Sequence, residues 1–69
     1  MVNKVLQYRD LLIQIRERQR RLDFLRKMIG RLELAGQPVD NARKNLLNLL
    51  LEIKDLQNKI RKLQLQYRS

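Results

Sequence analysis

Apolar side chains recur at alternating steps of three and four residues along this chain, and that repeat restricts the folds open to it. In the second half the repeat comprises Val39, Ala42, Leu46, Leu49, Ile53, Leu56, Ile60, Leu63 and Tyr67. In the first half it comprises Tyr8, Leu11, Ile15, Arg18, Leu22, Leu25, Ile29 and Leu32. A spacing of about 3.5 residues is typical of α-helices that pack side by side along one seam. We therefore expect an all-α protein.

The segment AGQPVD interrupts this pattern near the middle of the chain. Gly36 suits the left-handed conformation just past a helix end, and Pro38 suits the first turn of a new helix. Two helices of similar length joined by a short turn form an antiparallel hairpin, here a two-stranded coiled coil. The turn disfavours the alternative of one continuous helix.

The two halves of the repeat also match each other when the chain is folded back. Layers at one level then pair Ile29 with Leu46, Leu22 with Ile53, Ile15 with Ile60, and Tyr8 with Tyr67. This agreement favours the hairpin. We predict one helical-hairpin domain over residues 1–69, with a helix at about 3–35, a turn at about 36–38 and a helix at about 39–67.

Further apolar side chains lie beside and behind the seam, where two helices cannot cover them. We predict that they form an oligomer interface, and they are Leu12, Ile13, Phe24, Met28, Leu47, Leu50 and Leu51. The simplest way to bury them is a homodimer in which two hairpins make a four-helix bundle. The alternatives are a higher oligomer, a hairpin that docks on a larger protein partner, a stable monomer and a designed bundle.

The stretch RERQRR, residues 16–21, belongs to a strongly basic chain of net charge +9. On a helix its arginines do not share one face. A longer set spans a face of about 60° on the first helix. With cations near the end of the second helix, this basic ridge comprises Arg9, Arg16, Arg20, Lys27, Arg31, Arg61, Lys62 and Arg68. We interpret it as a solvated face, with nucleic-acid phosphates or an acidic protein as the alternative partners.

Arg18 is the one charged residue of the repeat. With Gln19 and Gln57 it is expected to form a polar layer that sets the register of the helices, and the alternative is that its side chain extends into solvent. Gly30 lies inside the first helix and away from the seam, where it costs about 1 kcal/mol relative to alanine. We interpret Gly30 as a tolerated weakness or as a point of close approach by a partner.

The composition excludes most kinds of catalysis. The chain has no cysteine and no histidine, and Ser69 is its only serine. We expect no enzyme activity, no cofactor, no metal and no small-molecule substrate. Because no apolar run approaches about 20 residues and no signal-peptide pattern opens the chain, we expect no membrane span and a cytoplasmic, intracellular location.

The sequence therefore predicts a non-catalytic structural or protein-interaction module, a self-associating hairpin with a basic outer surface. The alternative is a small dimer that binds the backbone of RNA or DNA. The expected architecture is similar to the Rop type of RNA-binding four-helix bundle. That similarity lies in the fold alone, so no functional residue carries over from it.

Overall fold

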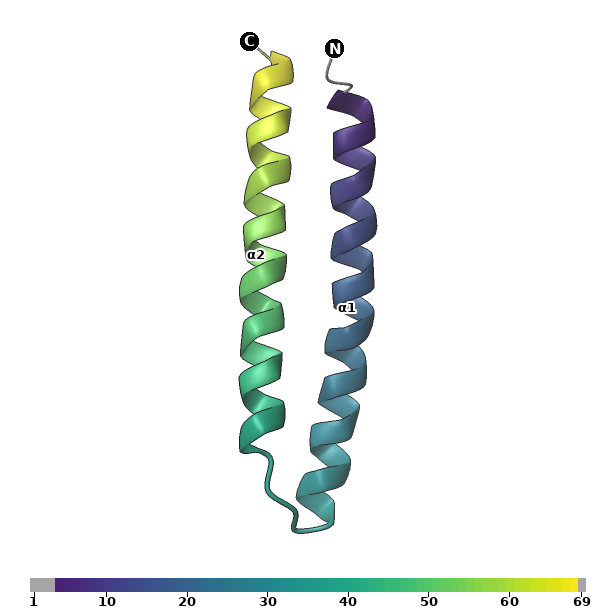
Figure 1. The fold of residues 1–69 in the computed structure, drawn as a ribbon, viewed down its shortest axis with the longest axis vertical. Helices are drawn as coiled ribbons and strands as arrows, with labels where there is room; N and C mark the ends of the chain where they lie inside the picture. Colours follow the sequence, from purple (N-terminus) through teal and green to yellow (C-terminus); the bar gives the residue numbers. More distant parts are fainter. Residues whose placement is uncertain (1–3, 69) are drawn as a thin grey trace.

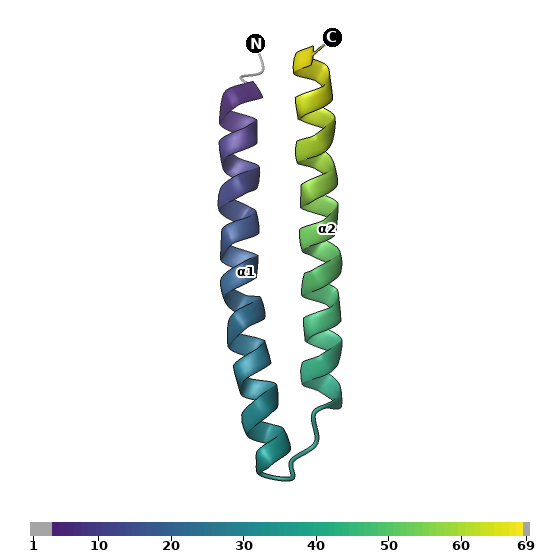
Figure 2. The same ribbon diagram turned by 180° about the vertical axis from the view of Figure 1, so that it is seen from behind.

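The chain folds into two long helices that lie side by side and run in opposite directions (Figures 1 and 2). The structure is a computed structural model that describes residues 4–68 and the side chains of residues 5–66. Helix α1 spans Lys4–Leu34 and helix α2 spans Asp40–Arg68. The molecule is a rod of 53 × 16 × 15 Å. The predicted all-α antiparallel hairpin is confirmed.

Helix α1 ends in a hydrogen-bonded turn built around Gly36. This glycine has a φ of 70°, in the left-handed region that side chains with a Cβ disfavour. The N–H of Gly36 donates to the carbonyl of Glu33 at 3.1 Å, and the N–H of Gln37 donates to that of Leu32 at 2.8 Å. These two bonds satisfy carbonyls that the end of the helix would leave free, the arrangement known as a Schellman motif. The predicted role of Gly36 is confirmed.

The start of α2 differs from the prediction by the length of the turn. The helix begins at Asp40, so Pro38 lies ahead of it and not in its first turn. The carbonyl of Val39 accepts a hydrogen bond from the N–H of Arg43 at 2.9 Å, which makes Val39 the capping residue. Asp40 then places its carboxylate at the positive end of the helix dipole.

The core lies along the predicted seam. The buried side chains keep 6 to 8% of their surface exposed, and they are Ile15, Leu22, Ile29, Leu49, Ile53 and Leu56. Leu22 and Ile53, expected at one level, belong to the same apolar cluster, against which Ile60 packs from the next layers. Every other seam residue whose side chain is described is half-buried. Tyr67, expected opposite Tyr8, has a side chain outside the described residues.

The turn yields a first prediction. Replacing Gly36 with alanine should lower the free energy of unfolding by about 1–2 kcal/mol, because a Cβ is strained at this φ. Urea denaturation followed by circular dichroism measures the change. The matched control is Gln37→Ala, which keeps the backbone hydrogen bond to Leu32 and should alter stability by less than about 0.5 kcal/mol. Equal stability of the two variants would contradict the role given to Gly36.

Candidate interaction surfaces

A two-helix seam leaves a flank on each side, and the two flanks of this hairpin differ. We call one the Arg18 flank, because Arg18 reaches across it to Glu52. We call the other the Leu50 flank, which carries Leu12 and Leu50 beside the seam and the ion pair of Glu33 with Arg43 at 3.6 Å. Residues seven apart along either helix fall on the same flank, so heptad position assigns the remaining side chains.

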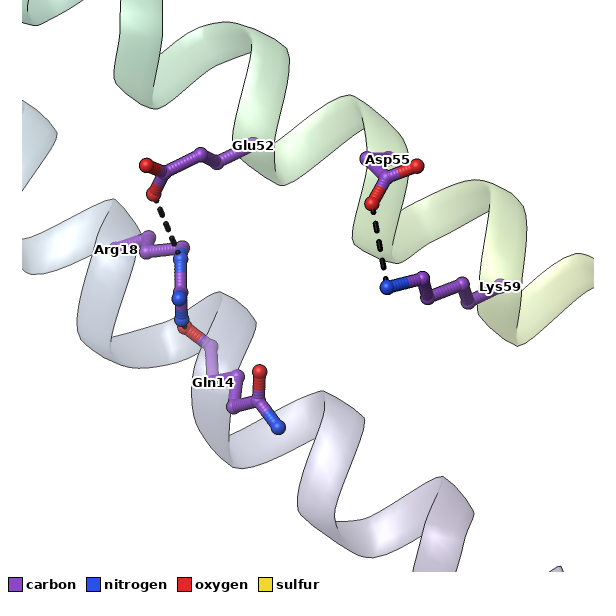
Figure 3. A network of polar contacts seen from close by, with 5 residues as sticks. All are labelled: Gln14, Arg18, Glu52, Asp55 and Lys59. Carbon is purple, nitrogen blue, oxygen red and sulfur yellow. Dashed lines mark hydrogen bonds and ion pairs between the residues drawn. The ribbon is translucent and has the colours of Figure 1, made fainter.

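A chain of polar contacts crosses the Arg18 flank (Figure 3). The Nε of Arg18 donates to Oε2 of Glu52 at 2.9 Å, and its Nη1 donates to the backbone carbonyl of Gln14 at 3.2 Å. The Nε2 of Gln14 donates in turn to Oδ2 of Asp10 at 2.8 Å. The Arg18 side chain is 28% exposed and that of Glu52 is 53% exposed. The methylenes of Arg18 therefore follow the seam while its guanidinium reaches the surface.

Two open hollows lie on the same flank, one heptad to either side of this ion pair. Towards the turn, the hollow is lined by Arg21, Phe24, Leu25, Asn45, Asn48, Leu49 and Glu52. Towards the open end, the other is lined by Gln7, Asp10, Leu11, Lys59, Lys62 and Leu63. Leu11 and Leu25 hold the seam position that Arg18 holds between them. The groove is open beside Leu11 and Leu25, whereas beside position 18 the longer arginine side chain and Glu52 fill it.

The expected polar layer has a different composition in the hairpin. Gln19 and Gln57 are both exposed, and neither bonds to Arg18 within the residues that the structure describes. The partner of Arg18 is Glu52, a residue outside the predicted polar layer. The sequence could have indicated this partner, because Glu52 lies within about one turn of Leu56, the residue expected opposite Arg18. An arginine is long enough to span that offset.

The apolar residues assigned to an interface do not form one patch. By heptad position Leu12, Leu47 and Leu50 lie on the Leu50 flank, Phe24 and Met28 on the Arg18 flank, and Ile13 and Leu51 on the outer faces. Leu12 is half-buried and the others are exposed, Phe24 most of all at 63%. Apolar side chains outside that set are exposed too, and they are Val5, Leu6, Leu34 and Leu65.

The basic ridge is exposed along α1, and Arg61 and Lys62 are exposed on α2. The side chain of Arg68 lies outside the described residues. Among the residues that are described, no ridge cation forms an ion pair within 4.0 Å. The predicted ridge is not one continuous surface, since Lys62 lies on the Arg18 flank and Arg61 lies on the Leu50 flank.

Away from the turn, the two flanks differ in their acidic residues. In the half of the hairpin away from the turn, the described acidic residues all lie on the Arg18 flank, and they are Asp10, Glu17 and Asp55. Asp55 pairs there with Lys59 at 3.3 Å (Figure 3). The same half of the Leu50 flank carries Arg9, Arg16 and Arg61 without a described acidic residue. It is therefore the more strongly positive surface.

The described residues offer neither a metal site nor a membrane-spanning helix, and no similar protein indicates a site. Within residues 4–68 no group of three acidic, histidine or cysteine side chains could hold a metal ion. Neither helix, over its described length, is apolar enough to cross a membrane. A scan against protein-family models finds no match, and comparisons with curated proteins and with solved structures find no similar chain.

The hypothesis that Arg18 sets the register predicts the behaviour of Arg18→Leu. An exposed ion pair contributes at most about 1 kcal/mol, whereas a leucine half-buried like Leu11 and Leu25 contributes about half of the 1.5–3 kcal/mol of full burial and also removes the cost of holding a charge beside the seam. The variant should therefore melt at a higher temperature and show a mixture of oligomeric states. Calorimetry and sedimentation measure the two effects, with Glu52→Gln as the control that removes the ion pair alone. An unchanged melting temperature with one unchanged oligomer would contradict the hypothesis.

Proposed function

We propose that this chain is a non-catalytic interaction module, a helical hairpin that associates with a second copy to form a four-helix bundle. The observation that carries the proposal is the exposure of large apolar side chains around the whole rod. Leu47, Leu51 and Phe24 each expose more than half of their surface, while even the most buried core residue, Leu56, keeps 6% exposed. A second hairpin is the simplest partner able to cover one of these surfaces.

The size of the chain supports the same proposal. A domain of 69 residues without a disulfide gains little stability from its own core, about 3–5 kcal/mol. Here that core is one seam between two helices. Burial of Leu12, Leu47 and Leu50 against another copy would add apolar area that the hairpin alone leaves in water.

The solution mass tests the proposal. Light scattering should give twice the chain mass of 8.4 kDa at both low and high salt, because apolar burial does not depend on screening of charges. A helical monomer at every concentration would contradict self-association. A monomer of low helicity would instead favour the alternative in which the chain docks on a larger protein.

A second candidate function is binding to the phosphate backbone of nucleic acid. It is favoured by the separation of charge, since Arg9, Arg16 and Arg61 share the half of the Leu50 flank away from the turn, where no described acidic residue lies. These exposed cations form no ion pair within the described part of the chain, so a row of phosphates could replace their counter-ions. Contacts of this kind position a protein on RNA or DNA without reading its sequence.

Replacing Arg9 and Arg16 with glutamine tests this second function. Affinity for a generic RNA duplex should fall several-fold, and the slope of log K against log salt should fall by about 1 for each phosphate that the variant no longer neutralises. The matched control is Arg26→Gln with Lys44→Gln, which removes two exposed cations nearer the turn. Equal reductions in affinity for both double variants, or no binding by the original chain, would contradict a phosphate site here and turn attention to an acidic protein.

A further inference from the structure

We infer that the second copy docks on the Leu50 flank, with the two turns at the same end and with Leu47 of each copy seated on Gly30 of the other. This inference rests on the proposed self-association and adds its face, its orientation and its central contact. The occupant is a second copy of this chain.

The ion pair between Glu33 and Arg43 agrees with the register of the seam, in which Leu22 packs with Ile53, and together they indicate which residues lie at one level on this flank. Moving one heptad at a time away from the turn places Arg26 level with Leu50, Gln19 with Gln57, and Leu12 with Gln64. The next row outward follows the same steps and places Gly30 level with Leu47, Asp23 with Lys54, and Arg16 with Arg61. The flank is therefore two matched rows.

A twofold axis parallel to the rod brings α1 of one copy against α2 of the other at the same level. Two residues that lie level in one hairpin then face each other between the two copies, and the symmetry makes this contact twice. Gly30 faces Leu47 of the partner copy, and Asp23 faces Lys54 of the partner copy. The two copies need not slide along each other, because residues that lie level across one hairpin also lie level across the interface.

Gly30 is the residue that a lone hairpin does not explain. A glycine in the interior of α1 costs about 1 kcal/mol of helix stability relative to alanine. A Cβ built on Gly30 would meet no atom within 4 Å, so nothing inside the hairpin requires its absence. The missing side chain leaves a flat place where another backbone or a large side chain can approach closely. Leu47, at 57% exposure, is an apolar side chain at the matching level.

The charges on this flank complement each other in the same arrangement. Asp23 and Lys54 are both exposed, and neither forms an ion pair within the described residues of the hairpin. Across the interface they lie opposite each other, and Glu33 gains a second arginine in Arg43 of the partner copy. With the turns at opposite ends and Gln57 on the axis, Lys54 would instead face Arg61 of the partner copy.

The Arg18 flank offers a poorer surface to a second copy. Its groove is filled midway by the Arg18–Glu52 pair, in which Arg18 is only 28% exposed, so a second copy could not reach the seam there. Both members of the Glu33–Arg43 pair on the Leu50 flank are instead more than half exposed and lie near the turn. On the Leu50 flank the like charges of Arg16 and Arg61 meet only in the half away from the turn. The close contact is therefore centred on Gly30, Leu47 and Leu50.

Gly30→Gln is the direct test. In the hairpin alone glutamine meets open space and favours helix, so helicity should stay the same or rise. In the proposed dimer it collides with Leu47 of the partner copy, and the dimer dissociation constant should rise at least tenfold, about 1.4 kcal/mol. Sedimentation equilibrium measures this change, with Asn58→Gln on the outer face of α2 as the control. A dimer as tight as that of the original chain would overturn the inference.

Two further variants test the face and the orientation. Leu47→Gln should weaken the dimer at least tenfold, whereas Leu65→Gln should leave it unchanged although Leu65 is 60% exposed and Leu47 57%. Asp23→Lys should weaken the dimer, and adding Lys54→Asp should restore it. Failure of the double variant to recover would overturn the orientation.

The same measurements separate the two proposals. A monomeric original chain would refute self-association itself. A dimeric original chain whose Gly30→Gln and Leu47→Gln variants dimerise equally well would leave self-association standing and refute only the Leu50 flank as its site.

Discussion

Two helices touch along a single line, and this geometric limit governs the whole molecule. Each helix can direct about two residues in every seven towards its neighbour, which here places Ile15, Leu22 and Ile53 in the core. Water reaches both flanks of that seam, so no residue in the described part of the chain is fully buried. The leucines beyond the seam follow from the same limit, because a rod of this width has no interior left for them.

The sequence predicts the seam well and the flanks poorly, for a physical reason. Seam residues such as Leu22 and Leu56 repeat with the period of the helix, so their inward direction can be read from spacing alone. Arg18 shares that spacing, but its partner Glu52 depends on the length and rotamer of a flexible side chain. The prediction for Pro38 is wrong because the number of residues needed to cross between two helices is a tertiary property.

The separation of the interface residues into two flanks also required the structure. Phe24 and Leu47 look alike in sequence, as exposed apolar residues outside the seam, yet they lie on opposite sides of it. The flank on which each residue lies follows from the antiparallel packing of the helices, which the ion pair of Glu33 with Arg43 shows. Once that register is known, the half of the Leu50 flank away from the turn is seen to carry no described acidic residue. Both proposed surfaces lie on the Leu50 flank, the one for a second copy towards the turn and the one for phosphates away from it.

The turn joins the helices at one end of the rod, while the far ends of α1 and α2 lie together at the other end (Figure 1). A load that draws those far ends apart would act on one layer of the seam at a time, beginning beside Leu11 and moving towards Gly36. Each layer would give way before the next carried the force. A load applied along the axis of a single helix would instead oppose all layers together. The hairpin is thus mechanically weak in one direction and resistant in the other.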